Sequence, residues 1–193
     1  MKLPTMGWMF VPLVDYHGGG ADAAFEPMSE HLPEYEMALA QYLLAGTAAC
    51  YRGFRLYDTP SVEAVVSKYV AVVKAYRDIV TSDIIHVRRP NGQTLDAFMH
   101  ANALLPAGRP SGFAVVFNPT SAPRTETMVF PLYYTGIATR AMLSFEGAAP
   151  VAFAVARDYS VAVNVTLAAQ SVTWFAISSG DAGAAAAAVS AAG

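Results

Sequence analysis

Apolar and polar positions repeat with two different periods along this chain. Between residues 7 and 81, short apolar runs alternate with segments in which apolar residues return every three or four positions. After Ser82 the period becomes two, which is the spacing of strands that bury one face. The pattern therefore predicts an α/β part followed by an all-β part.

The first part predicts two strands and two helices in alternation. Residues 8–14 and 47–51 are short apolar runs typical of buried strands, although Pro12 weakens the first prediction. A helix is expected from Pro33 to about Gly46, with one apolar face formed by Tyr35, Leu39, Tyr42 and Leu43. A second helix is expected after Thr59, because Thr59 suits the N-cap and Pro60 the first helical position. Its apolar stripe is Val62, Val65, Val66, Tyr69, Val73, Tyr76 and Val80.

The second part predicts a series of short strands. They are expected at residues 84–88, 95–101, 113–117, 127–132, 151–155, 161–167 and 172–177. Turn sequences such as Asn91-Gly92 and Glu146-Gly147 lie between them. Short strands at this spacing favour an antiparallel β-sandwich of about 95 residues.

The order of elements predicts the domain organisation. A β-α-β-α block needs a parallel sheet whose faces are both covered, and two strands do not provide one. A complete (β/α)8 barrel takes ~250 residues, roughly 30 per βα unit. We therefore expect residues 1–81 to be the last two βα units of such a barrel, residues 82–179 an antiparallel β-sandwich, and the alanine-rich residues 180–193 a disordered tail. The alternative is one self-contained α+β domain in which both helices cover a single sheet.

Composition and charge exclude several classes of protein. Of the 193 residues, 54% are hydrophobic and 14% are charged, which excludes disorder of the whole chain. The net charge is -3 and no basic cluster exceeds Arg88-Arg89, so no nucleic-acid partner is expected. No apolar run reaches the roughly 18 residues of a spanning helix, so no membrane partner is expected either. Cys50 is the only cysteine and no zinc-type ligand spacing occurs, so no metal or other cofactor is expected.

Two loops carry the candidate chemistry. They are residues 15–27 and 52–58, which follow the expected parallel strands at the end where barrels hold their sites. Together they supply carboxylates, arginines, a histidine and aromatic rings, the mixture with which proteins hold sugars. The candidate substrate-binding residues are Asp15, Tyr16, His17, Glu26, Arg52, Arg55, Tyr57 and Asp58.

The same loops also admit other interpretations. Glycoside hydrolysis needs two carboxyl groups, but no two of Asp15, Glu26 and Asp58 can be paired from the sequence, so no catalytic residue is assigned. Asp58 also suits the entry of a helix, and Glu26 a turn. The run of residues 17–20, HGGG, is similar to the oxyanion loop of esterases, but no G-x-S-x-G follows it.

Several segments resemble glycoside hydrolases. The segments similar to the end of the catalytic barrel in a group of large glycoside hydrolases are FVPLVDYHGGG (10–20), FEP (25–27), EHL (30–32) and ACYRGFRLYDT (49–59). The segment SDIIHVRRPNG (82–92) is similar to the passage from barrel to C-terminal sandwich in α-galactosidase-like enzymes, and VVFNPT (115–120) and PLYYTG (131–136) resemble strands and turns of that sandwich.

The resemblance implies a barrel and a sandwich that act on glycosidic bonds. It places the catalytic carboxylates on earlier barrel strands, outside the 193 residues, so we expect this chain to be inactive by itself. The partners implied are a carbohydrate substrate and the rest of the catalytic barrel. The alternative function is a non-catalytic β-sandwich module that binds carbohydrate or packs against a barrel. Exposed, coplanar rings of Tyr133 and Tyr134 would favour this alternative.

Overall fold

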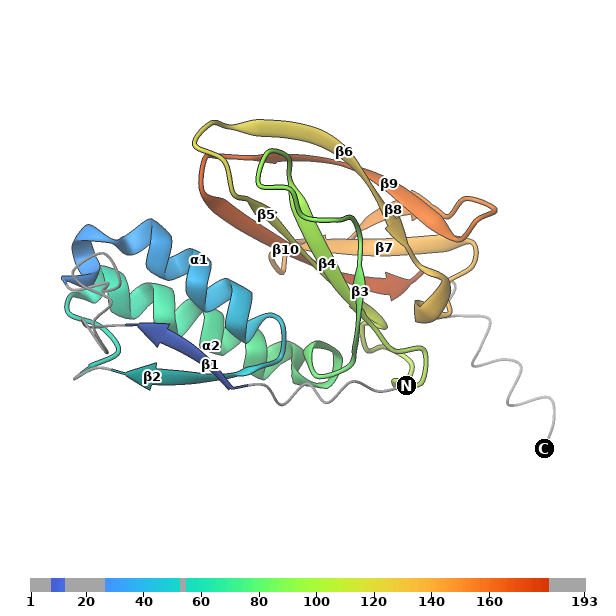
Figure 1. Ribbon diagram of the computed structural model, residues 1–193. Coiled ribbons are helices and arrows are strands. Elements are labelled where there is room, and N and C mark those ends of the chain that lie inside the picture. Colours follow the sequence, from blue (N-terminus) through green and yellow to red (C-terminus); the bar gives the residue numbers. More distant parts are fainter. Residues whose placement is uncertain (1–7, 13–26, 53–54, 181–193) are drawn as a thin grey trace. The chain divides into compact units, whose positions relative to one another are not determined.

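The computed structural model describes residues 8–12, 27–52 and 55–180, with the backbone alone for residues 8–12 and 48–52. The chain divides into two compact units, Met1–Thr81 and Ser82–Gly193, here called unit 1 and unit 2. Figure 1 shows helices and two strands in unit 1, and strands with one short 3-10 helix in unit 2. The predicted alanine-rich tail lies outside the described residues from position 181 onward.

Unit 1 alternates strands and helices as predicted. Strand β1 (Trp8–Pro12) pairs in parallel with β2 (Ala48–Arg52), and α1 (Leu32–Leu43) connects them after the short 3-10 helix η2 (Met28–Glu30). Helix α2 (Pro60–Val80) follows β2. A parallel pair cannot be joined by a tight turn, so α1 serves as the crossover that the pairing requires.

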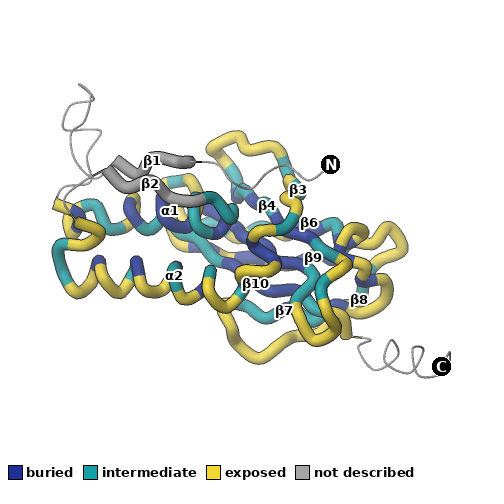
Figure 2. The backbone as a smooth tube through the Cα atoms, turned by 90° about the horizontal axis from the view of Figure 1, so that it is seen from below, coloured by how far each residue is buried: buried dark blue, intermediate teal, exposed yellow. Residues whose placement is uncertain are grey.

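Both helices bury one face. Tyr35 and Leu39 of α1 are buried as predicted, together with Ala38 and Ala40. On α2 the predicted positions Val62, Val66, Tyr69 and Val80 are buried, and Val72 and Ile79 join them. The backbone leaves helical geometry at Tyr76 (φ -114°, ψ 21°), and Ile79 is buried beyond this kink. Figure 2 shows the buried positions of α2 returning at intervals along an otherwise exposed helix.

Tyr69 and Gly46 connect the two helices of unit 1. The Tyr69 hydroxyl donates to Glu36 Oε1 at 2.9 Å, and Lys68 Nζ donates to the same oxygen at 3.0 Å. Gly46 follows α1 with φ +71°, and its N–H donates to the Leu43 carbonyl oxygen at 3.1 Å. A Cβ at position 46 would overlap the Val80 carbonyl oxygen at the end of α2. The chain just after α1 therefore passes so close to the end of α2 that no side chain fits at position 46.

Unit 2 consists of two antiparallel sheets. Its strands are β3 (Asp83–His86), β4 (Asp96–Ala101), β5 (Gly112–Asn118), β6 (Arg124–Pro131), β7 (Arg140–Phe145), β8 (Val151–Ala154), β9 (Ser160–Leu167) and β10 (Ser171–Ser179). The larger sheet has the order β3-β4-β5-β10-β7-β8, and β6 pairs with β9 in the smaller one. The sequence did not predict β7, which pairs with both β10 and β8.

The core of unit 2 joins these two sheets. Alternate positions at and just before β4 belong to it, namely Leu95, Ala97, Met99 and Ala101. Alternate positions of β6 and β9 also belong, among them Phe130 and Val163. Alternation of core and non-core residues along each strand fixes the register, because a slip by one residue would turn every side chain to the other face.

The larger sheet is apolar on its other face as well. Strand β5 is buried at every position, which explains why its sequence is a continuous apolar run rather than an alternating one. On this second face the rings of Phe113 and Trp174 stack with centroids 5.3 Å apart, and His100 is buried beside Phe113. Trp174 is thus a buried residue of this face.

We predict that Gly46→Ala destabilises the chain more than Gly92→Ala does. Both glycines have positive φ, +71° and +69°, so both substitutions bring the ~1–2 kcal/mol cost of a side chain in the left-handed region. Nothing lies within 4 Å of a Cβ at position 92, whereas one at position 46 meets backbone. Thermal unfolding followed by far-UV circular dichroism measures the difference, and equal shifts of Tm in the two variants would contradict the close approach.

Candidate functional site

The two candidate loops follow β1 and β2 at the carboxyl ends of the parallel pair. Asp15, Tyr16, His17 and Glu26 lie outside the described residues and stay predictions. Arg52 is the last residue of β2 and lies opposite Pro12 of β1 in the register. The described part of the site is therefore the second loop, from residue 55 to Thr59, with the segment that precedes α1.

Hydrogen bonds fix the second loop to the segment before α1. The backbone N–H and the hydroxyl of Ser29 both donate to Asp58 Oδ2, at 3.1 and 3.2 Å. The buried Tyr35 donates its hydroxyl to the Leu56 carbonyl oxygen at 2.9 Å. Ser29 and Tyr35, which follow the first loop in the chain, therefore hold the second loop in place. These bonds join the segment at the start of α1 to the segment between β2 and α2.

Asp58 is held in its ionised form. Desolvation acts to raise the pKa of the Asp58 carboxyl, but the hydrogen bonds from Ser29, from its own backbone and from Thr59 outweigh it and keep the pKa below the ordinary 3.8. An ionised carboxylate accepts hydrogen bonds from hydroxyl groups and does not donate a proton. This chemistry suits sugar binding rather than general acid catalysis.

The entry of α2 differs from its predicted capping. Thr59 occupies the N-cap position, but its side chain makes no capping bond to the helix backbone. Its hydroxyl instead donates to Asp58 Oδ1 at 3.4 Å and lies 3.0 Å from the Ser61 hydroxyl oxygen. Asp58 thus takes part in the start of α2, which is the alternative role that the sequence suggested for it.

Two further candidates of the second loop are exposed. Arg55 lies at the surface, and the Tyr57 side chain is 43% exposed. Next to the ionised Asp58 they give a hydrogen-bond donor, an aromatic ring and an acceptor within four consecutive positions of the chain. Such a set recognises the hydroxyls and the apolar face of a pyranose.

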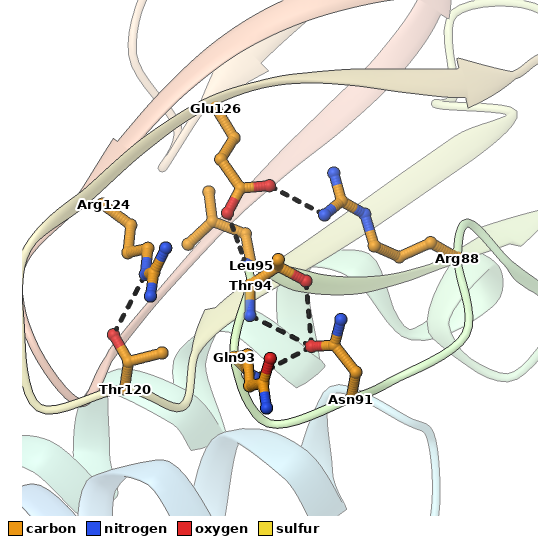
Figure 3. A network of polar contacts seen from close by, with 8 residues as sticks. All are labelled: Arg88, Asn91, Gln93, Thr94, Leu95, Thr120, Arg124 and Glu126. Carbon is orange, nitrogen blue, oxygen red and sulfur yellow. Dashed lines mark hydrogen bonds and ion pairs between the residues drawn. The ribbon is translucent and has the colours of Figure 1, made fainter.

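Unit 2 holds a polar network around Glu126, which Figure 3 shows in detail. Glu126 of β6 accepts a hydrogen bond from Arg88 at 2.7 Å through Oε2, and one from the Leu95 backbone N–H at 2.9 Å through Oε1. Asn91 Oδ1 orders the turn between Arg88 and Leu95 by accepting from the N–H groups of Gln93 and Thr94. The network joins the smaller sheet to the loop between β3 and β4 of the larger sheet, which is a structural role.

The charge state of Glu126 follows from these contacts. Burial acts to raise the pKa of its carboxyl, but the hydrogen bonds from Leu95 and Arg88 and the positive charges of Arg88 and Arg124 outweigh it. They hold the pKa below the ordinary 4.5. Glu126 is therefore ionised at neutral pH and stabilises unit 2 as an acceptor.

His100 of unit 2 lies in a structural environment. His100 is buried, and its Nδ1 lies 3.2 Å from the Ser82 carbonyl oxygen. No three or more His, Cys, Asp or Glu side chains gather as a metal site among the described residues. No helix in the described part of the chain is long and apolar enough to cross a membrane.

Tyr133 and Tyr134 are exposed but not coplanar. Their side chains are 64% and 65% exposed, and their ring planes meet at 89°. The flat platform that would have favoured a carbohydrate-binding module is therefore absent from this pair.

Comparison with known proteins gives a fold but no family. No family model matches the chain, and no curated protein does. Solved structures do match it. The α-amylase from Geobacillus thermoleovorans is 10% identical to this chain, with a TM-score of 0.60. The matched region covers 92% of this chain and 40% of the amylase chain. A GH27 β-L-arabinopyranosidase from Geobacillus stearothermophilus is 7% identical, with a TM-score of 0.51. The matched region covers 75% of this chain and 29% of the arabinopyranosidase chain.

An α-amylase from Anoxybacillus is also similar, with 10% identity, a TM-score of 0.55 and coverage of 91% of this chain and 39% of its own. The fold is glycoside-hydrolase-like. At these identities the likeness concerns the fold alone. The chain spans at most about 40% of the length of these three enzymes.

We predict that Asp58→Ala loosens the segment around Ser29. The variant removes the carboxylate that accepts from the Ser29 N–H, so this amide should exchange with solvent faster, as measured by NMR hydrogen exchange. Because the pKa of Asp58 is lowered, its contribution is present above the ordinary 3.8 and is lost as the pH falls below it. Ser61→Ala is the control, since Ser61 contacts Thr59 but not Ser29. Equal exchange of the Ser29 amide in Asp58→Ala and the unaltered chain would contradict the prediction.

We predict that Glu126→Gln reduces the acid sensitivity of unit 2. A carboxylate with a lowered folded-state pKa contributes stability that is complete above the unfolded-state pKa, near 4.5, and that is lost as the pH falls from there through the lower folded-state pKa. At neutral pH the variant should lose about 1.5–3 kcal/mol, the range for a hydrogen bond to a charged group, and it should lose less of its remaining stability as the pH falls below about 4.5. Urea unfolding at several pH values measures both effects. Parallel pH profiles of the two proteins would show that Glu126 does not carry this dependence.

Proposed function

We propose that this chain is the C-terminal portion of a glycoside hydrolase that cleaves O-glycosidic bonds. Unit 1 supplies the last two βα units of a (β/α)8 barrel, and unit 2 is the β-sandwich that follows the barrel. The catalytic carboxylates lie on the preceding barrel strands, so no residue of this chain has a catalytic role. The partners are the carbohydrate substrate and the rest of the barrel.

The parallel pair β1 and β2 carries the proposal. Each of these strands is followed by a helix, and the antiparallel sheets begin directly after the second helix. Parallel sheets occur almost only where helices cover both faces and further strands complete the sheet. The likeness to an α-amylase over 92% of this chain, but only 40% of the amylase, supports the same organisation.

The two loops of unit 1 line the substrate pocket in this proposal. Barrel enzymes bind their substrates with the loops that follow the carboxyl ends of the strands, where both loops lie. Tyr57 stacks on the apolar face of a sugar ring, Arg55 donates to its hydroxyls, and Asp58 accepts from them. The other residues that we assign to the pocket are Asp15, Tyr16, His17, Glu26 and Arg52.

Mass spectrometry of the native polypeptide, combined with an assay on a panel of aryl glycosides, tests the proposal. We expect a native product several times larger than 20.5 kDa that hydrolyses at least one glycoside, while the 193-residue chain alone does not. In the native enzyme, His17→Ala and Arg52→Ala should lower kcat/KM by roughly tenfold or more, because each removes a group that contacts the sugar.

Arg89→Ala is the matched control, because Arg89 is an exposed arginine of unit 2. It should leave the kinetics unchanged. A native product of 20.5 kDa would overturn the barrel proposal. Unchanged kinetics in both His17→Ala and Arg52→Ala would overturn the pocket role of the loops.

A further inference from the structure

Three exposed tyrosines gather on the surface of unit 2. Tyr133 and Tyr134 belong to the 3-10 helix η3 (Tyr133–Thr135), and Tyr159 belongs to the turn between β8 and β9. The Tyr133 ring lies 5.2 Å from the Tyr134 ring and 5.4 Å from the Tyr159 ring, centroid to centroid. Their side chains are 64%, 65% and 41% exposed, in chain order. We call these three residues the tyrosine cluster.

The backbone beneath the tyrosine cluster is firmly held. The N–H of the buried Leu132 donates to the Tyr159 carbonyl oxygen at 2.6 Å, which joins the two segments. Thr135, also buried, donates its N–H and its hydroxyl to the Leu132 carbonyl oxygen at 2.9 and 2.6 Å. Asp158 accepts from the N–H and the hydroxyl of Ser160 and orders the turn that carries Tyr159. The rings are thus presented on a preorganised surface, which reduces the entropy lost when a ligand binds.

Tyr159 occupies a backbone conformation that favours glycine. Its φ is +61°, and its N–H donates to the Ala156 carbonyl oxygen at 2.9 Å. Hairpin loops of this length place glycine at the left-handed position, because a side chain there is strained. Strained residues other than glycine concentrate at functional sites. Glu146 and Gln170 also have positive φ, so the position of the Tyr159 ring beside Tyr133, and not its backbone conformation alone, carries the argument.

The chemistry of the tyrosine cluster is amphipathic. None of the three hydroxyls has a hydrogen-bond partner within the described part of the chain, so all three are free to meet a ligand. The Tyr133 ring is nearly perpendicular to both neighbours, at 89° and 84°, so the rings form a corner rather than a flat apolar patch. A corner with ring faces and free hydroxyls matches a sugar, which has apolar C–H faces and a rim of hydroxyl groups.

We infer that the tyrosine cluster is a surface site that binds a glycan by stacking. At least one ring packs against the face of a pyranose, and the phenol hydroxyls exchange hydrogen bonds with the sugar hydroxyls. The inference goes beyond the proposed function, because binding here needs neither loop of unit 1 nor a catalytic carboxylate. It concerns unit 2 alone, so its failure and the failure of the proposed function are separate results.

The test is a binding titration of the 193-residue chain with four oligosaccharide probes, followed by NMR of the tyrosine ring signals. The probes are maltoheptaose, cellohexaose, a galactomannan oligosaccharide and an arabinan oligosaccharide. At least one probe should shift the ring signals of the cluster. Tyr133→Ala and Tyr134→Ala should each weaken binding about tenfold, the effect typical of one well-packed aromatic contact. The corresponding phenylalanine variants keep the ring and should retain more of the affinity.

Val129→Ala is the control, because Val129 is an exposed apolar side chain of β6 outside the cluster. It should bind like the unaltered chain. The variant Tyr159→Gly distinguishes a role of Tyr159 in binding from a role in stability. Relief of the strained backbone should keep Tm at or above that of the unaltered chain, while binding weakens. A lower Tm with unchanged affinity would make Tyr159 a structural residue and contradict its role in binding.

Three results would overturn the inference. The first is a folded chain that binds none of the probes at millimolar concentration. The second is unchanged binding in a variant with alanine at all three positions. The third is self-association of the chain that Tyr133→Ala abolishes, since the cluster would then be a protein contact.

Discussion

The parallel pairing of β1 with β2 is the constraint on which the organisation of this chain depends. Parallel strands need a long crossover, and α1 provides it; they also need cover on both faces of their sheet. Within the described residues each of the two strands has one hydrogen-bonded neighbour, the other strand. Unit 2 needs no such crossover, because its strands pair antiparallel and its two sheets pack on each other around a common core. The proposal of further barrel strands answers the requirement of unit 1.

Asp58 in unit 1 and Glu126 in unit 2 are charged side chains that join segments far apart in the sequence. Each is a carboxylate that accepts backbone and side-chain hydrogen bonds from a segment about 30 residues away along the chain, Ser29 for one and Leu95 for the other. In both, the hydrogen bonds outweigh desolvation, so the charged form is favoured. A low fraction of charged residues is thus compatible with specific electrostatic links, because a few carboxylates connect segments that hydrophobic packing alone would leave less defined.

The sequence predicted those elements whose signals are local. Thr59 and Pro60 marked the start of α2, and the period of two marked a strand at residues 95–101, where β4 lies. Strand β7 was missed although Ala141 and Leu143 alternate into the core, because its six residues, RAMLSF, include none of the β-branched residues that are typical of strands. The bond between Ser29 and Asp58 joins positions far apart along the chain, and no local pattern encodes it. The ring angle of Tyr133 and Tyr134 depends on the turn that Gly136 closes with φ +75°, which the adjacency of two tyrosines does not specify.

The energetics of weak binding favour a sugar polymer over a monosaccharide as the ligand of the tyrosine cluster. Stacking on a few rings gives only weak affinity, and a surface of this size would be a poor site for a free monosaccharide. A polymer is different, because a chain attached at one point keeps its other sugar units at a high effective concentration near any second site on the same protein. Weak affinity is then an advantage, since the attachment reverses quickly and the polymer can be released.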